Sequence, residues 1–172
     1  TRIYNSSGGK LIKNNDDFIS EGDVAHVDST FFDVFTFPVI AGDPKTALSE
    51  PNTIVITEST ALKYFGTTQA LGKTIETDEH GSTLYKVTAV IEDMPLNSHF
   101  NFDFLFSMSN VNYDWGDFTS HNFHTYILLQ KGVGSEEVEL PRAGEPTPVR
   151  RAQVALMSVS VPAGRHGIRP QR

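Results

Sequence analysis

The chain has 172 residues, no cysteine and a net charge of −7. The absence of cysteine excludes a disulfide framework, thiol catalysis and cysteine-ligated zinc, and the acidic balance disfavours nucleic acid, which binds through cationic contacts to phosphate. No apolar run approaches the roughly 18 residues that cross a bilayer, and no signal peptide is present. Because the sequence begins at Thr1, we expect a piece of a longer protein whose targeting or membrane segments lie elsewhere.

The first part of the chain is predicted to form short strands and one helical turn. The segment IYNSSGGKLIK predicts a hairpin whose turn is Ser6 to Gly9, and DVAHVD alternates like a further strand. Next, Phe31 and Phe35 lie four residues apart, as they would on one face of a single helical turn. We expect Ser29 or Asp28 to cap that turn.

The stretch YFGTTQALGKTIE, residues 64–76, resembles a phosphate-binding loop because Gly66 is followed by Gly72-Lys73-Thr74. The nucleotide-binding pattern requires four residues between its first glycine and Gly-Lys-Thr, whereas this chain has five. The context is also reversed, since a helix capped by Thr57 precedes Gly66 and a strand follows it. A phosphate loop follows a strand and opens a helix. The sequence therefore predicts a structural turn and no nucleotide site.

Two more strands are predicted around this loop. TIVIT, residues 53–57, is short and apolar, which implies burial on both faces. After the loop, a hairpin turns at residues 78–81 into the long strand TLYKVTAVIED. Four alternating side chains of that strand are expected to share one face: Tyr85, Val87, Ala89 and Ile91.

The segment HFNFDFLFS has a phenylalanine at every second position: Phe100, Phe102, Phe104 and Phe106. A period of two places them on a single face of a strand. We interpret that face as core. The alternative is a face that packs on another subdomain or on a partner chain.

The pattern weakens after this row. Residues 108–122 are irregular, FHTYILLQK is a last strand, and SEEVEL could begin a helix capped by Ser135. Together these elements predict an α+β fold in which strands dominate.

The last 32 residues, 141–172, differ from the rest in composition. They contain six Arg, one Glu, no aromatic residue and five of the nine prolines, whereas residues 1–140 carry 8 basic and 20 acidic residues. They have no sustained period, so we interpret them as a disordered or non-native tail. Only VALMSVSV, residues 154–161, could form a strand there.

No catalytic or metal-binding constellation rises above the background of an acidic chain. The densest gathering of suitable residues comprises Asp114, Asp117, His121 and His124, with His99 and Asp103 just upstream. A divalent metal requires two or three such ligands to converge, but the three-residue spacing of the last two histidines points to opposite faces of a strand. No serine lies in a G-x-S-x-G elbow. We therefore predict no enzyme activity, no metal and no cofactor.

Four segments together resemble a known family: HVDSTFFDVFTFPVIAGDPKTAL, TIVITESTALKYFG, ALGKTIE and YKVTAVIEDMPLNSHFNFDFLFS. Their combination is similar to the extracytoplasmic (periplasmic) core domain of MacB/FtsX-like ABC transporter permeases, in the variety common in Bacteroidetes. The resemblance covers roughly residues 20 to 131.

The resemblance implies a periplasmic domain inserted between the first two transmembrane helices of an inner-membrane permease. Its fold would be a mixed α/β subdomain with an inserted strand-rich subdomain. On this basis residues 1–140 would form the core domain, with about 43–94 as the inserted part, and 141–172 would be an atypical tail.

The resemblance also implies a function in transmission rather than in chemistry. A cytoplasmic ABC ATPase would drive movement of the transmembrane helices, and the periplasmic domain would couple that movement to export or release. A second permease copy and a periplasmic adaptor protein are the other implied partners, and we expect Asp114, Trp115 and Asp117 to contact a partner. The alternative function is a periplasmic small-ligand-binding or sensor module.

Overall fold

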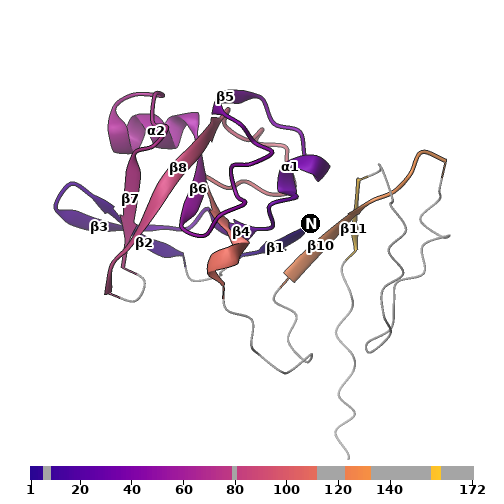
Figure 1. The fold of residues 1–172 in the computed structure, drawn as a ribbon, viewed down its shortest axis with the longest axis horizontal. Coiled ribbons are helices and arrows are strands. Elements are labelled where there is room, and N and C mark those ends of the chain that lie inside the picture. Colours follow the sequence, from indigo (N-terminus) through magenta and orange to yellow (C-terminus); the bar gives the residue numbers. More distant parts are fainter. Residues whose placement is uncertain (6–8, 79–80, 112–122, 133–155, 160–172) are drawn as a thin grey trace, which may run out of the picture.

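The computed structural model describes the chain except for residues 6–8, 79–80, 112–122, 133–155 and 160–172 (Figure 1). Its helices are α1 (Phe31–Val34), α2 (Glu58–Phe65) and the 3-10 turn Met108–Asn110. Its strands are β1 (Arg2–Tyr4), β2 (Lys10–Asn14), β3 (Asp17–Glu21), β4 (Val24–Val27), β5 (Val39–Gly42), β6 (Thr53–Thr57), β7 (Thr74–Thr77), β8 (Thr83–Ile91), β9 (Phe104–Ser107), β10 (Phe123–Leu128) and β11 (Leu156–Val159).

The strands form one mixed sheet in the order β11-β10-β1-β4-β9-β6-β8-β7-β2-β3, with β5 paired to β8 beside this path. The pairs β4–β9 and β6–β8 are parallel, and the other pairs are antiparallel. In Figure 1, β3 lies at one end of the molecule and β10 with β11 at the other. The mixed sheet with its helices confirms the α+β prediction.

The central strands are buried on both faces, because each contributes alternately to two hydrophobic clusters. In β6, Ile54 and Ile56 belong to one cluster and Val55 belongs to the other. Strand β9 alternates in the same way. Helix α1 contributes Phe31 to the first cluster and α2 contributes Ala61 to the second, so the two helices cover opposite faces. The predicted two-sided burial of residues 53–57 is confirmed, since all five are buried.

The hairpin predicted for residues 3–13 is wrong. Strand β1 pairs with β4 and β10, whereas β2 pairs with β3 and β7, so five strands separate β1 from β2 in the sheet. The hairpin in this region joins β2 to β3, and its two-residue turn holds Asn15 at φ 56°, a conformation that asparagine tolerates better than most residues.

The shared face predicted for the long strand β8 is also wrong. Tyr85 and Val87 lie in the cluster under α2, but Ala89 and Ile91 lie in the cluster under α1. The physical reason is a bulge, because the register with β6 shifts between Ile54 and Val55. An extra residue in a strand moves every side chain that follows it to the opposite face of the sheet.

The phenylalanine row divides between the two faces as well. Phe100 and Phe102 pack in the α1 cluster, whereas Phe104 and Phe106 lie in the α2 cluster. Strand β9 begins only at Phe104, so the alternation does not extend over the whole row. The interpretation as core is confirmed for the last three members of the row, which are buried.

The helix and turn predicted around the glycine-rich loop are confirmed. The Thr57 side chain accepts a hydrogen bond from the Thr60 backbone N–H, and Gly66 ends α2 at φ 66°. The loop leads into β7, so the order is helix, turn, strand. The cap predicted for α1 is wrong, since Thr30 occupies that position and makes no side-chain capping bond.

At the C-terminal end, β11 falls within the one segment predicted as a strand, residues 154–161, and pairs with β10. The helix predicted at 135–140 lies outside the described residues. Among the described residues, no helix is long and apolar enough to cross a membrane.

Candidate functional site

Carboxylates from three elements hold α2 against the sheet. Asp93, just after β8, accepts hydrogen bonds from the Ser59 backbone N–H at 3.0 Å and from the Ser59 hydroxyl at 2.5 Å. Asp103, just before β9, accepts a weaker bond of 3.4 Å from the Thr57 hydroxyl. At the other end of the helix, Glu21 of β3 accepts bonds from both Lys63 Nζ and the Tyr64 hydroxyl, each at 2.6 Å. Sequence reasoning identified the cap at Thr57 but none of these long-range pairs.

The protonation of these groups depends on their surroundings. Burial, followed by the charge of Asp23, raises the pKa of Asp103. Burial acts to raise the pKa of Asp93 too, but the two bonds from Ser59 outweigh it and the pKa is lowered. Burial and the bond to Glu21 raise the pKa of Tyr64, so its hydroxyl remains a donor. The charged form of Asp93 is therefore favoured in the folded domain, whereas the charged form of Asp103 is disfavoured.

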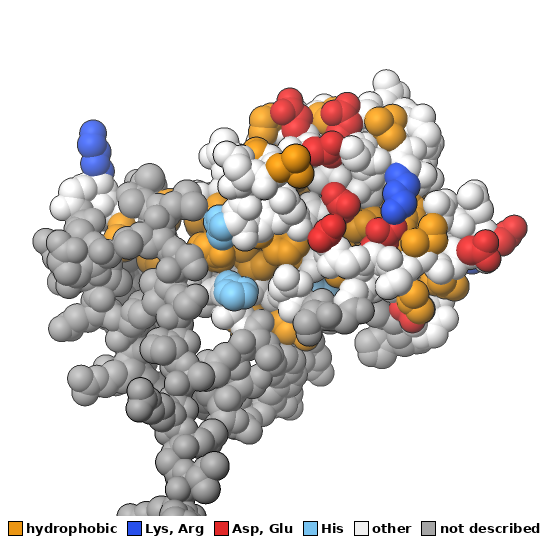
Figure 2. Space-filling view, turned by 180° about the vertical axis from the view of Figure 1, so that it is seen from behind, with side chains coloured by type: hydrophobic (Ala, Val, Ile, Leu, Met, Phe, Trp, Pro, Cys, Tyr) orange, Lys and Arg blue, Asp and Glu red, His pale blue; other side chains and the backbone are white. Residues whose placement is uncertain are grey.

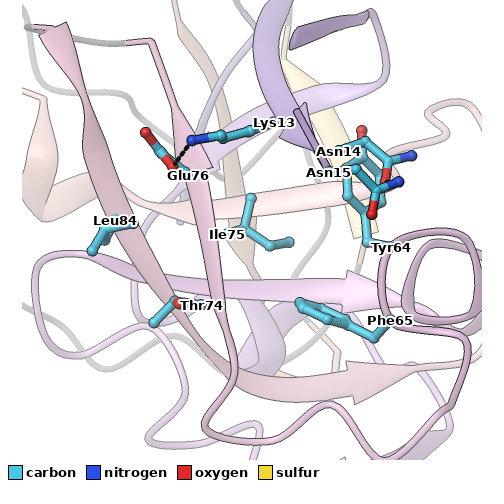
Figure 3. Close-up of a pocket in the computed structure, with 9 residues that line it drawn as sticks. All are labelled: Lys13, Asn14, Asn15, Tyr64, Phe65, Thr74, Ile75, Glu76 and Leu84. Atoms are coloured by element: carbon cyan, nitrogen blue, oxygen red, sulfur yellow. Dashed lines mark hydrogen bonds and ion pairs between the residues drawn. The ribbon is translucent and has the colours of Figure 1, made fainter. Parts of the chain in front are cut away.

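A hollow of about 300 Å³ lies beside the C-terminal end of α2 (Figure 3). Its lining comes from the end of β2 and the turn after it, α2, β7 and β8: Lys13, Asn14, Asn15, Tyr64, Phe65, Thr74, Ile75, Glu76 and Leu84. In Figure 3, Lys13 points toward Glu76, and their Nζ and Oε2 atoms are 2.8 Å apart. Hydrogen bonds from Lys13 and then Ser82 lower the pKa of Glu76. The charges in the hollow thus already satisfy one another.

The histidines and carboxylates considered as metal ligands do not converge among the described residues. His99 lies in the aromatic cluster around α1, where its Nε2 is 3.0 Å from the Tyr126 hydroxyl, and His124 is exposed on β10. Asp103 belongs to the α2 anchor. In the part of the chain that the structure describes, no three His, Asp or Glu residues could hold a metal ion.

The residues predicted to contact a partner lie outside the described residues: Asp114, Trp115 and Asp117. His121 also lies there. For the phenylalanine row, Phe102, Phe104 and Phe106 are at most 7% exposed, so these three side chains cannot form a surface for a partner chain while the domain is folded. The other alternative, packing on another subdomain, stays a prediction.

The exposed surface carries acidic and apolar side chains together. Figure 2 shows acidic side chains distributed over one face with hydrophobic side chains between them and few basic ones. The large exposed hydrophobic side chains belong to the β2–β3 hairpin, β5, α2, β8 and the loops after α2 and β8: Leu11, Phe18, Ile19, Val39, Ile40, Leu62, Leu71, Leu84 and Leu96.

The chain is similar to solved domains of membrane permeases. A domain from Porphyromonas gingivalis, described as belonging to a permease, has 28% sequence identity and a TM-score of 0.53 over 63% of this chain and 45% of its own. The periplasmic region of MacB from Actinobacillus actinomycetemcomitans has 16% identity and a TM-score of 0.49, covering 72% of this chain and 53% of its own. The extracellular domain of the ABC-type transporter YknZ from Gram-positive bacteria has 17% identity and a TM-score of 0.47, covering 72% and 60%.

This chain therefore spans about half the length of the solved domains that it matches. No curated protein sequence matches it significantly. Residues 3–140, which make up most of the chain, match the family model of the MacB-like periplasmic core domain. The protein belongs to the MacB-like periplasmic core domain family.

Proposed function

We propose that this domain is the extracytoplasmic part of an ABC transporter permease and couples ATPase-driven movement of transmembrane helices to export or release in the periplasm. The observation that carries the proposal is the family match over residues 3–140. The P. gingivalis domain supports it, because that protein is described as a permease. The partners that we propose are a cytoplasmic ABC ATPase, a second permease copy and a periplasmic adaptor. Within the domain, residues 43–94 would be the inserted part.

The anchored helix α2 supports a role in transmitting movement. Asp93 after β8 and Glu21 on β3 bond to α2, and Asp103 before β9 bonds to its N-cap residue Thr57, so the helix and the sheet would move as one body. A domain of this kind transfers a displacement without deforming. A substrate-converting site would instead require titratable groups directed into a cavity.

A ligand-binding function is the second candidate, and the hollow beside α2 is the observation in its favour. Its volume of about 300 Å³ is at the lower limit for small-molecule sites, which are also mostly apolar. Here the lining is largely polar, and its two charged side chains, Lys13 and Glu76, already form an ion pair with each other. A thermal shift of the domain by any member of a small periplasmic-metabolite library would favour this candidate.

The proposed function is testable in the intact permease through engineered cysteines. Because these 172 residues contain no cysteine, Asp114→Cys introduces the domain's single thiol, at the predicted contact loop; any cysteine elsewhere in the permease is replaced by serine first. In membranes that contain the permease and its ATPase, we expect disulfide crosslinking between two copies, with a yield that differs between ATP-bound and ADP-bound states. Asp78→Cys, at an exposed residue before β8, is the matched control and should crosslink poorly in both states. Equal yields for Asp114→Cys in both states would contradict coupling.

A further inference from the structure

Strand β3 forms an open edge of the sheet. Within the described residues it pairs only with β2 and ends the strand order, and Figure 1 shows it at the extremity of the molecule. Its first four residues are exposed, including two large apolar side chains, Phe18 at 44% and Ile19 at 36%. An exposed edge with apolar side chains is a template for pairing with another strand.

The register with β2 identifies the backbone groups that this edge presents. Asn14 and Asp17 flank the two-residue turn and are paired, so they form the hydrogen-bonded pair, and the pattern alternates from there. Consistent with this, the carbonyl of Leu11, opposite Ser20, points away from β3 and accepts a bond from the Asp78 N–H at 3.3 Å. The N–H and C=O groups of Phe18 and Ser20 therefore point outward from the sheet.

The charge at this edge is negative and unpaired. Asp16 and Asp17 lie at the start of β3 and Asp23 just beyond its end, all three exposed. None of the three side chains makes an ion pair among the described residues. The basic residues beside the strand do not pair with these three carboxylates. Lys13 pairs with Glu76 and Lys63 with Glu21, and Lys10 is buried with its Nζ over the Phe106 ring. A strand added here would meet apolar side chains in the middle and carboxylates at both ends.

This charge pattern argues against a second copy of β3 as the occupant. Two copies paired along β3 would bring together the carboxylates of Asp16, Asp17 and Asp23, which make no ion pair among the described residues. Like charges that face each other destabilise a strand pair. A partner strand with basic residues at those positions would have the opposite effect.

We propose that β3 is a docking edge for an extended basic segment of a partner protein, which adds to the sheet as a strand next to β3. The segment would carry an apolar β-branched residue opposite Ile19 and a Lys or Arg opposite Asp17, two positions away. Main-chain bonds to Phe18 and Ser20 would provide the pairing, and the flanking charges would provide the selectivity. This proposal goes beyond the transport function and does not depend on it.

The test is a selection with the full 172-residue chain against a phage library of random ten-residue peptides. We expect enriched peptides to alternate apolar residues and to carry a basic residue two positions from a central Val or Ile. Synthetic versions of the enriched peptides would then be measured by fluorescence anisotropy. An absence of enrichment, or an enrichment of acidic peptides, would overturn the proposal.

Two variants test whether the peptide docks along β3 in the proposed register. Ser20→Pro removes an outward N–H and should weaken peptide binding by about tenfold, while the hairpin persists because that N–H is not bonded to β2. Asp17→Lys should weaken binding by about threefold or more, and a peptide with Glu in place of the facing basic residue should recover it. Recovery by the Glu-containing peptide would require contact between the peptide and position 17. If Ser20→Pro and Asp17→Lys both left peptide binding unchanged, docking on β3 would be disproved.

Self-association is measured separately, by sedimentation velocity of the chain alone. A dimer abolished by Ser20→Pro would identify a second copy as the occupant and would overturn the proposal of a basic partner. Thermal unfolding of each variant followed by circular dichroism serves as the folding control. If Ser20→Pro fails to fold, the charge-swap pair still decides the outcome, because Asp17 is exposed and unpaired.

Discussion

At the scale of single residues, the anchor of α2 combines two carboxylates that respond oppositely to pH. Asp103 has a raised pKa because it is partly buried and lies near Asp23. Asp93 has a lowered pKa because Ser59 donates two hydrogen bonds to it. A raised pKa in the folded state means that charging the group destabilises the fold, whereas a lowered pKa means that charging stabilises it.

We predict that Asp103→Asn stabilises the domain at pH 7 by about 0.5 kcal/mol, a value reduced for partial exposure. Asn is neutral at every pH, so the variant avoids the cost of the charged carboxylate. The stability that wild type gains by protonation is fully present below the unfolded pKa of 3.8 and is lost as pH rises through the raised folded value. Urea denaturation should therefore show a gain at pH 7 that vanishes near pH 3.5.

Asp93→Asn is the matched control, because it should change the stability of the domain at pH 7 in the opposite direction. The stability contributed by the Asp93 charge is present above the unfolded pKa of 3.8 and is lost as pH falls through the lowered folded value. The variant should therefore be less stable than wild type at pH 7 and approach it only in stronger acid. If the two substitutions changed stability in the same direction at pH 7, the environments assigned to these groups would be wrong.

At the scale of secondary-structure elements, the contact of β5 with β8 depends on a glycine. Gly42 has φ 93°, and a Cβ at this position would overlap the Thr88 carbonyl oxygen and lie 2.8 Å from the Ala89 Cα. This close approach coincides with the bulged part of β8, where the strand exchanges its two faces.

We predict that Gly42→Ala destabilises the domain by about 3 kcal/mol or more, because backbone atoms block the Cβ and the positive φ adds strain. Gly66→Ala is the matched control. Gly66 also has a positive φ, 66°, but nothing lies within 4 Å of a Cβ there, so about 1 kcal/mol is expected. Chemical denaturation of both variants measures the difference. Equal effects would mean that φ alone, and not the approach of β8, determines the requirement at Gly42.

Elements with strong local signals could be predicted from the sequence. The cap at Thr57, the glycine at 66 and the apolar run of β6 each follow from adjacent residues, and all three are observed. Strand pairing could not be predicted in the same way. Strand β1 pairs with β10, about 120 residues away along the chain, and nothing in either local pattern identifies that partner.

The faces of the strands were only partly predictable. The alternation of Tyr85 to Ile91 gives a single face unless the backbone is interrupted, and the bulge that interrupts it depends on the register with β6. The contacts of α2 with Asp93 and Asp103 are likewise long-range. A single sequence contains the donors and acceptors of these contacts but not their distances. The predicted contact loop at 114–117 and the division into subdomains remain predictions.

The loop after α2 gives a further prediction, which is negative. Gly66 caps the helix, the Gly72 N–H donates to the Val87 carbonyl at 2.8 Å, and Lys73 Nζ lies 5.0 Å from the centre of the Phe65 ring. These groups hold the loop to α2 and β8 rather than forming a nest for phosphate. Millimolar ATP with magnesium should leave the melting temperature unchanged. A stabilisation that Lys73→Ala abolishes would contradict this expectation.

At the scale of the whole molecule, strand β10 lies between strand β1 of the acidic body, residues 1–140, and strand β11 of the basic tail, residues 141–172. Strand β10 pairs on one side with β1, and the N-terminal amine donates to the Tyr126 carbonyl at 2.9 Å. On its other side it pairs with β11 of the tail. Tyr126 and Leu129 are buried, and Tyr126 belongs to the α1 cluster. The contacts that fix β10 to the core therefore come from residues 1–132.

We predict that truncation after Leu140 preserves the fold and changes the melting temperature by no more than about 2 °C, a shift typical of a small change in stability. The truncation removes β11 and all residues of the basic tail, but it leaves the pairing of β10 with β1 and the α1 cluster intact. Differential scanning calorimetry of the full and truncated chains measures the change. As a control, truncation after Asn110 removes β10 as well, exposes the α1 cluster and should abolish cooperative unfolding. If the shorter cut at Leu140 already abolished it, β11 would be an integral strand of the core and the tail would belong to the folded domain.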